Sequence, residues 1–271
     1  MNYLWLIFIA MAGLFYYNTI GWLIESWINN PYYSHGFLVP FVSGYILFST
    51  RKELAGVELK QYNAGIALFI GGIFLHGVGV LWTARFISGL SLIAVISGMI
   101  LFLFGWNFLR KIIFPILFLL LMIPLPFVDI VAPSAQTISV VFSSNLANLV
   151  DIPVQREGLE LHLQTGSFEV GVPCSGLRSI VSLIMIAALY AFILEGGMMM
   201  KLIIVISSIP LALAGNILRI TSVLAVASKY GQEVALNYFH DFSSILFFVV
   251  SLSGLIFVGR CFGRLKFKKI F

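Results

Sequence analysis

The chain has 271 residues, of which 60% are hydrophobic and only 10% are charged. A soluble globular domain is nearer a quarter charged, so this composition excludes one and indicates an integral membrane protein whose first partner is the lipid bilayer. The net charge of +5 includes a basic tail, typical of anchoring on the cytoplasmic side of a membrane. No basic stripe lies on a soluble domain, so we expect no nucleic acid partner.

Eight apolar runs approach the ~20 residues that are needed to cross a bilayer. They lie at about 3–24, 36–50, 63–82, 86–105, 112–128, 177–194, 201–228 and 242–259, with ends uncertain by a few residues. We therefore predict an all-α integral membrane protein with about eight transmembrane helices. It forms a single domain over residues 1–271, and no extra C-terminal soluble domain is expected.

Positive charges predict the orientation of these spans, because short cytoplasmic loops carry an excess of Lys and Arg. If the spans alternate strictly, one side of the membrane receives Arg51, Lys52, Lys60, Arg110, Lys111, Lys201, Arg260, Arg264, Lys266, Lys268 and Lys269. The opposite side is mainly acidic. Both termini are then cytoplasmic, and the longest loop, about 129–173, is external. Cys261 lies on the cytoplasmic side and cannot pair with Cys174, which follows this loop.

The external loop has a pattern of its own. From Ala132 to Val150, apolar residues recur at helical spacing among serines and asparagines, which predicts an amphipathic helix at the membrane interface or over a cavity. From Val154 to Val170, polar and apolar residues alternate around two glycine-containing turns, which predicts a short β-hairpin.

One stretch after this loop carries a candidate nucleophile, Cys174. Pro173 cannot continue a preceding helix, and Ser175-Gly176 favours the start of a new one, so we expect Cys174 at or near a helix N-terminus. The N–H groups and the dipole there favour the thiolate, and Arg178 adds positive charge one turn later. The alternative is that Cys174 is simply a small buried apolar residue.

Arg219 lies deep within the seventh apolar run, where a charge is costly and is a functional candidate by default. Asn216 and Ser222 flank it at three residues on either side, so a polar stripe crosses an otherwise apolar helix. A structural arginine paired with a buried carboxylate is the alternative. No carboxylate lies deep in any predicted span, which weakens that interpretation.

Three histidines fall on the predicted external side and are candidates for proton transfer, the role that suits this side chain near neutral pH. His240 lies in the last external loop, at the start of the eighth run, and its rivals are His35 and His162. His76 lies inside the third run and is expected to be a core residue with its hydrogen bonds satisfied. Thiol acyl transfer needs a nucleophile, a proton shuttle and a donor for the oxyanion, and Cys174, His240 and Arg219 supply those types.

Several of these motifs resemble the exosortase/archaeosortase family of multispanning membrane cysteine enzymes. The similarity covers roughly residues 30–245 and rests on an ordered Cys, Asn-x-x-Arg and His set. The stretches that carry it are Tyr33-Ser34-His35-Gly36-Phe37-Leu38-Val39-Pro40, Pro124-Leu125-Pro126, Val154-Gln155-Arg156-Glu157-Gly158, Val172-Pro173-Cys174-Ser175-Gly176-Leu177-Arg178-Ser179, Asn216-Ile217-Leu218-Arg219 and His240.

The resemblance implies a cysteine protease or transpeptidase of a bacterial inner membrane, with its active site on the periplasmic side. Its substrates would be membrane-anchored proteins with a C-terminal sorting tail, which comprises a short motif such as Pro-Glu-Pro, a transmembrane helix and a basic end. Cys174 would form a thioester, His240 would act as acid and base, and Arg219 would stabilise the oxyanion or anchor the substrate. The acceptor could be water, a lipid amine or a sugar, and no cofactor or metal is implied. The candidate substrate-binding residues are Arg178, Asn216, Ser175 and His35.

Other functions remain possible from the residues alone. An anion-binding transporter would use Arg219 as its anion site, although the chain shows no internal repeat. A non-catalytic assembly factor for envelope polymers would not need Cys174. A serine or aspartic intramembrane protease is disfavoured, because the chain has no Gly-x-Ser-x-Gly elbow, no His-Glu-x-x-His and no intramembrane aspartate pair.

Overall fold

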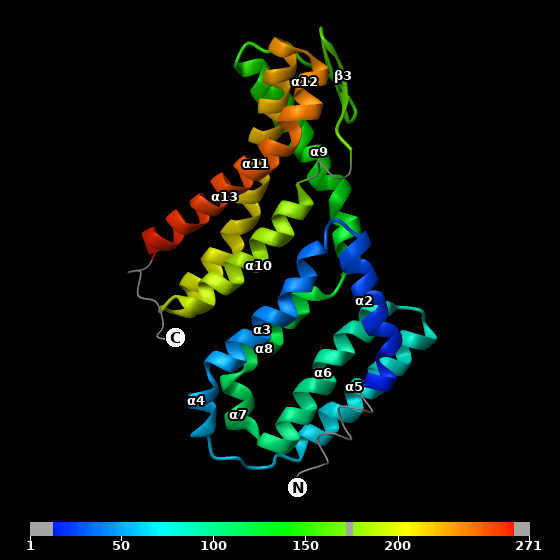
Figure 1. The fold of residues 1–271 in the computed structure, drawn as a ribbon, viewed down its shortest axis with the longest axis vertical. Coiled ribbons are helices and arrows are strands. Elements are labelled where there is room, and N and C mark those ends of the chain that lie inside the picture. The colour runs from blue at the N-terminus through cyan, green and yellow to red at the C-terminus, as the bar shows by residue number, and fades with distance from the viewer. Residues whose placement is uncertain (1–12, 172–175, 263–271) are drawn as a thin grey trace. The chain divides into compact units, whose positions relative to one another are not determined.

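The computed structural model describes residues 13–171 and 176–262 of the chain. Regular structure in this part is mostly helical, with one small antiparallel sheet (Figure 1). Of the described helices, 5 are long and apolar enough to cross a membrane, and three further apolar helices are shorter. The predicted class, a mostly α-helical multi-pass membrane protein, is therefore confirmed, whereas the number of eight spans stays a prediction. The chain divides into two compact units, Met1–Pro126 and Phe127–Lys269.

The first unit is entirely helical in its described part. Its elements are α2 (Tyr17–Asn29), η1 (Ser34–Phe37), α3 (Leu38–Ser49), α4 (Arg51–Ala55), α5 (Ala64–Leu81), α6 (Arg85–Phe104), α7 (Trp106–Lys111), α8 (Ile113–Phe118) and η2 (Leu119–Met122). Helices α5 and α6 form a hairpin in which glycines let the two backbones touch: a Cβ on Gly98 would lie 2.5 Å from the Phe69 nitrogen. Small residues at a helix interface are the usual means of close packing in membranes.

His76 is a core residue with a hydrogen-bond partner, as predicted from its place in an apolar run. Its Nδ1 lies 2.5 Å from Ser88 Oγ, which also contacts Thr19 Oγ1 at 3.0 Å. Tyr16 OH lies 2.9 Å from Ser91 Oγ on the same side of α6. These buried contacts tie the beginning of the first unit to the α5–α6 hairpin.

The fifth predicted span, 112–128, is not one continuous helix but is interrupted at residues 123–125. Helical structure stops at Met122, Ile123 is extended, and a new helix α9 (Pro126–Leu149) begins at Pro126. Proline is well suited to the first turn of a helix because its missing N–H needs no partner there. The predicted amphipathic helix at 132–150 is thus the second part of α9, which is itself long and apolar enough to cross a membrane.

The second unit combines α9 with a sheet and a helical bundle. The elements that follow α9 are β1 (Gln155–Glu157), β2 (Glu160–Leu163), β3 (Gly166–Glu169), α10 (Leu177–Ile193), α11 (Met198–Tyr230), α12 (Gln232–Val234), the π-helix η4 (Ala235–Phe239) and α13 (His240–Phe262). Helix α11 packs against both α10 and α13 (Figure 1). At its crossing with α13, a Cβ on Gly215 would lie 2.1 Å from Ser251 Oγ and 3.1 Å from the Phe247 carbonyl oxygen, so glycine allows this close approach.

The sheet has three strands, whereas the sequence predicted a two-stranded hairpin. The strand order is β1-β2-β3, both pairs are antiparallel, and Leu161 of β2 pairs with Phe168 of β3. The turn at Thr165-Gly166 creates the additional pairing, because Gly166 adopts a φ of 146° and returns the chain along β2. One face of the sheet is buried through Leu161 and Phe168, and the other faces outward.

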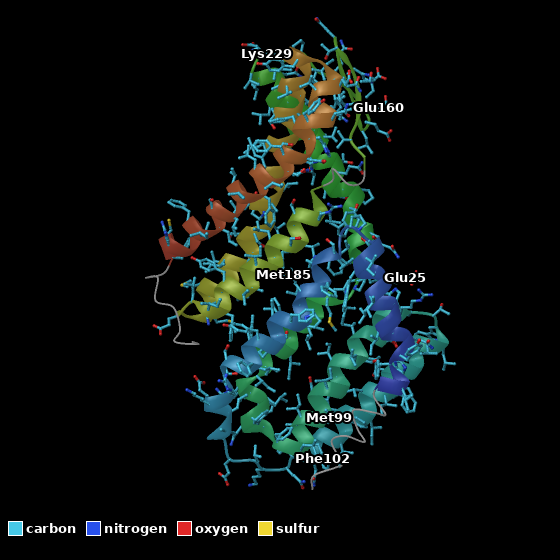
Figure 2. The ribbon with its side chains drawn as sticks, viewed as in Figure 1. Glu25, Met99, Phe102, Glu160, Met185 and Lys229 are labelled. Carbon is cyan, nitrogen blue, oxygen red and sulfur yellow. The ribbon has the colours of Figure 1, made fainter. Side chains whose placement is uncertain are left out.

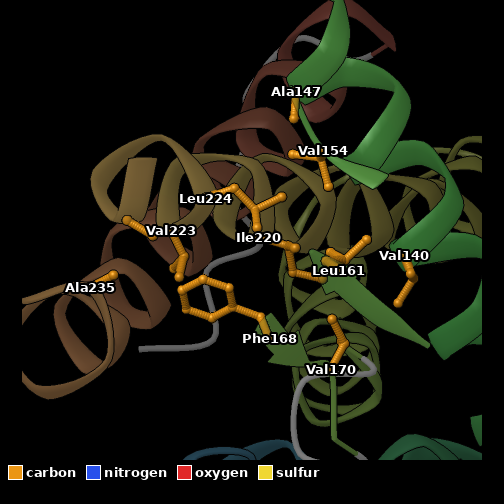
Figure 3. Close-up of a cluster of buried hydrophobic side chains, with 11 residues drawn as sticks. Val140, Ala147, Val154, Leu161, Phe168, Val170, Ile220, Val223, Leu224 and Ala235 are labelled. Carbon is orange, nitrogen blue, oxygen red and sulfur yellow. The ribbon is translucent and has the colours of Figure 1, made fainter. Parts of the chain in front are cut away.

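The buried face of the sheet joins the core of the second unit. Figure 3 shows the Phe168 ring pointing toward Ile220 and Val223 of α11, with Val140 of α9 and Leu161 nearby. Charged residues gather at the same end: Figure 2 shows Glu160 and Lys229 there, whereas Met185 lies part-way along α10. The unit therefore has an apolar helical body and a more polar end that includes the sheet.

Candidate active site

Cys174 and Ser175 lie outside the described residues. On either side of them, Val170 and Gly176 contact other helices of the second unit. The helix predicted to start just after Cys174 is α10, which begins at Leu177 with Gly176 as its N-cap. Only two peptide units separate Cys174 from Gly176, so their Cα atoms are at most ~7 Å apart. The position of Gly176 therefore limits where the thiol can lie.

Gly176 rests directly on Asn216 of α11. Its φ is +76°, which disfavours any residue with a side chain, and an added Cβ would lie 2.7 Å from Asn216 Cγ. Asn216 is only 4% exposed. The chain thus turns into α10 at a point where its backbone touches a buried amide.

Helix α9 braces this amide from the other side. Asn216 Nδ2 donates to Ser139 Oγ at 3.0 Å, Ser143 Oγ donates to the Ile217 carbonyl at 3.2 Å, and Thr221 Oγ1 donates to the Ser143 carbonyl at 3.4 Å. Both serines are fully buried. Interhelical hydrogen bonds of this kind fix the register of helices in an apolar setting, so α9 holds the polar stripe of α11 in place.

The upstream flank of Cys174 is also fixed by α9. The side chain of Gln136, which is 6% exposed, donates from Nε2 to the backbone carbonyl of Val170 in a short hydrogen bond. Val170 is itself buried and follows β3 directly. Helix α9 therefore acts on both sides of the segment that carries Cys174, through Gln136 upstream and through Ser139 and Asn216 downstream.

Arg219 and His240 form a close pair. Arg219 Nη2 lies 2.6 Å from His240 Nε2, and Arg219 Nη1 donates to Asn216 Oδ1 at 3.5 Å. Because a guanidinium has only donors, Nε2 must accept, and the imidazole proton is then on Nδ1. The π-helix η4 immediately precedes His240 and sets the direction in which its side chain leaves the backbone. π-helical turns of this kind occur frequently at functional sites.

Asp241 occupies the other nitrogen of the same ring. His240 Nδ1 lies 3.2 Å from Asp241 Oδ1, which fits a proton donated from Nδ1 to the carboxylate. The Asp241 side chain is 97% exposed, so this contact is well screened by solvent. The resulting order, Asn216, Arg219, His240 and Asp241, is a hydrogen-bonded chain from a buried amide to an exposed carboxylate.

A small cavity adjoins the Arg219–His240 pair. Its volume is about 70 Å³, and its walls come from the sheet and from α11. Arg219 and His240 line it together with aliphatic and aromatic side chains, among them Leu161, Phe168 and Val223. The Arg219–His240 pair therefore lies beside a small, mainly apolar cavity.

The other predicted residues have different surroundings. His162 belongs to the sheet, where its Nδ1 lies 2.7 Å from Ser167 Oγ, and His35 is a buried residue of the first unit. Arg178 is exposed on α10, and among the described residues it has no hydrogen bond or ion pair. Among the same residues, no cluster of three His, Cys, Asp or Glu side chains could hold a metal ion.

Sequence reasoning missed the contribution of α9. Gln136, Ser139 and Ser143 are polar residues spaced three and four apart on α9, and all are buried. That spacing places them on one helix face, which is a readable signal of a polar seam between helices. The sequence does not say which helix they meet.

The fold and the site define a multi-pass membrane protein with a buried polar stripe on α11 that ends in an arginine–histidine pair. The model of the transmembrane exosortase family matches residues 27–257 of the chain. The chain therefore belongs to the transmembrane exosortase family, as the motifs predicted. No curated protein and no solved structure matches the chain.

Proposed function

We propose that this protein is a membrane cysteine protease and transpeptidase that cleaves the C-terminal sorting signal of exported proteins. The observation that carries the proposal is the 2.6 Å contact between Arg219 of α11 and His240 of α13. Asn216, also on α11, lies against Gly176, which follows Cys174 by two residues. A nucleophile needs a base and an oxyanion donor close by, and these are the groups that the family's chemistry requires.

The reaction begins at the sulfur of Cys174. The thiol proton passes to His240 Nε2, and the thiolate attacks the scissile carbonyl carbon, forming a C–S bond and placing negative charge on the carbonyl oxygen. When this tetrahedral intermediate collapses, the C–N bond breaks and His240 returns the proton to the leaving amine. The product is a thioester, which a second nucleophile, water or a lipid or sugar acceptor, resolves to complete transfer.

Arg219 has two successive roles in this scheme. In the structure without substrate its Nη2 donates to His240 Nε2, the lone pair that a base must use. A carbonyl oxygen placed near the guanidinium competes for these N–H donors, since Arg219 has five of them in a planar fork. Substrate binding thereby turns the guanidinium toward the developing oxyanion and releases Nε2 to accept the thiol proton.

The substrate class follows from the membrane setting. A protein tail with a transmembrane helix and a basic end could enter the bilayer beside the long apolar helices of the second unit, with its cleavage motif near the polar end that carries the sheet. The positive-inside rule orients that end toward the periplasm, with both termini in the cytoplasm. Arg178 is exposed in the first turn of α10 and is a candidate contact for the motif.

The test is a processing assay in proteoliposomes with a tagged substrate that carries a candidate sorting tail. Wild-type enzyme would be compared with Cys174→Ala, Cys174→Ser, Arg219→Ala and His240→Ala, each at a verified protein level. Arg156→Ala is a matched control, since Arg156 is an exposed arginine of β1 that bonds only to the Gly158 carbonyl among the described residues.

Loss of cleavage in the Cys174 and Arg219 variants, with normal cleavage in Arg156→Ala, is the expected result. Unchanged processing by Cys174→Ala would rule out the mechanism. An assembly factor would keep its cellular function in that variant, and an anion transporter would instead lose anion flux in Arg219→Ala.

A further inference from the structure

The cavity beside Arg219 and His240 is lined mainly by apolar side chains. Six of its lining residues are apolar and nearly or fully buried: Leu161, Phe168, Val170, Ile220, Val223 and Leu224. The first three come from β2, β3 and the residue after β3, and the last three come from α11. The charged or hydrogen-bonding side chains that meet it are Arg219, His240 and the exposed Glu169.

The volume of the cavity limits what it can hold. Buried apolar cavities of about 150 Å³ accept benzene, which corresponds to roughly 25 Å³ per carbon atom. The present cavity is about 70 Å³ and partly open to its surroundings, so the space that it encloses fits roughly three carbons. An aliphatic side chain of the size of valine has that bulk, whereas a phenyl ring does not.

Water is a poor occupant for most of this space. A buried water needs two to four polar partners, and most of the lining side chains here are aliphatic or aromatic. A charged side chain would lose its hydration against the same walls, and an acidic one would also meet Glu169 at the border. The chemistry of the cavity thus selects a short uncharged aliphatic group.

We propose that this cavity is the subsite for the side chain of the substrate residue whose carbonyl is attacked. This inference rests on the proposed function, in which Arg219 donates to that carbonyl oxygen. The side chain and the carbonyl of one residue leave the same Cα, so a carbonyl held at Arg219 places its side chain in the space that Arg219 borders. The sheet, through Leu161 and Phe168, is then part of the specificity pocket.

Two residues set the width of the subsite. Phe168 supplies the largest wall, and its ring points toward α11 (Figure 3). Leu236 of η4 lines the cavity while remaining 44% exposed, so it forms the rim. Changing Leu236 alters the entrance with little loss of core packing, whereas truncating Phe168 also opens a cavity in the core.

The experiment compares substrates that carry Ala, Val, Leu or Phe at the residue before the scissile bond. For wild-type enzyme we expect kcat/KM to be highest for Val and at least about tenfold lower for Phe, since one methylene in an apolar pocket changes the rate about tenfold or more. In Leu236→Ala and Phe168→Ala the preference moves to Leu or Phe. In Leu236→Trp it moves to Ala.

Val154→Ala is the matched control, because Val154 is buried in the same apolar core but does not line the cavity. It is expected to lower thermal stability without changing the order of substrates. If the Leu236 variants keep the wild-type order, or if Val154→Ala changes it as strongly, the subsite assignment is wrong.

A second measurement separates this inference from the proposed function. Fluorescent tail peptides of the same four sequences are titrated onto full-length Cys174→Ala protein in nanodiscs, where no cleavage can occur. Binding that follows the size series and shifts in Leu236→Trp supports the subsite even if wild-type enzyme cleaves none of the peptides. Binding that ignores both side-chain size and the Leu236 substitution overturns it.

Discussion

Arg219 Nη2 and His240 Nε2 lie 2.6 Å apart, although the two residues are 21 positions apart along the chain. Arg219 lies about three helical turns before the end of α11, and His240 begins α13. The three residues of α12 and the π-helix η4 return the chain so that the two side chains face each other. This contact joins the buried polar stripe of α11 to a group that can exchange protons.

The contact between Arg219 and His240 predicts that cleavage depends on the planar shape of the Arg219 guanidinium as well as on its charge. Arg219→Lys keeps a positive charge but loses the planar fork that reaches His240 and a substrate carbonyl together. We expect the single-turnover rate of cleavage to fall about 100-fold, close to the 10²–10³ expected for loss of one oxyanion donor. Near-normal rates in Arg219→Lys would show that Arg219 acts as a simple point charge.

Gly176 provides a test of the support beneath the cysteine segment. Gly176→Ala forces a left-handed residue and a Cβ against Asn216, so we expect the cleavage rate to fall about 100-fold through misplacement of the nucleophile. Gly158→Ala is the matched control: Gly158 also has a positive φ, at +63°, but has nothing within 4 Å of an added Cβ. Cleavage should be near normal in Gly158→Ala, and equal losses in both variants would refute the role of the Asn216 contact.

Gln136 provides a test of the upstream anchor. Gln136→Leu leaves the buried Val170 carbonyl without its donor, which is expected to lower the free energy of unfolding by about 1–3 kcal/mol. Thermal unfolding in detergent measures this change. Thr137→Val on the same helix is the control, since Thr137 is exposed and bonds only within α9 among the described residues. If Gln136 also positions the cysteine segment, folded Gln136→Leu protein cleaves more slowly. A normal cleavage rate would show that Gln136 only stabilises the fold.

Asp241 is expected to matter much less than its neighbour. Its carboxylate contacts His240 Nδ1 but is 97% exposed, so solvent screens the interaction. We expect Asp241→Asn to change the cleavage rate by no more than about threefold, whereas His240→Ala removes the proton shuttle. A loss in Asp241→Asn comparable to that in His240→Ala would mean that the two residues work as one unit.

Several apolar helices could be predicted from sequence because each is a continuous apolar run near bilayer length. The runs expected at 63–82, 86–105 and 177–194 correspond to α5, α6 and α10 within one residue at each end. The start of α9 could not be placed from sequence, because Pro126 can end one apolar segment or begin the next. Local spacing could not decide between them.

Contacts within the site were beyond sequence reasoning for a different reason. Residue types identified Arg219 and His240, yet His35 and His162 matched the same pattern of an external histidine. The packing of α11 with η4 and α13 brings His240 to Arg219, and the pairing of β2 with β3 engages His162 with Ser167. Those choices depend on how distant helices and strands pack, which a spacing rule does not contain.

The most direct test of the account is capture of the acyl-enzyme. Protein carrying Cys261→Ser, which removes the exposed second cysteine, is mixed with tagged substrate, quenched in acid and analysed by mass spectrometry of its peptides. The account predicts a thioester-linked substrate fragment on Cys174 that hydroxylamine releases, and its loss in Arg219→Ala. Cleaved substrate with no adduct on Cys174, or an adduct on another residue, would contradict it.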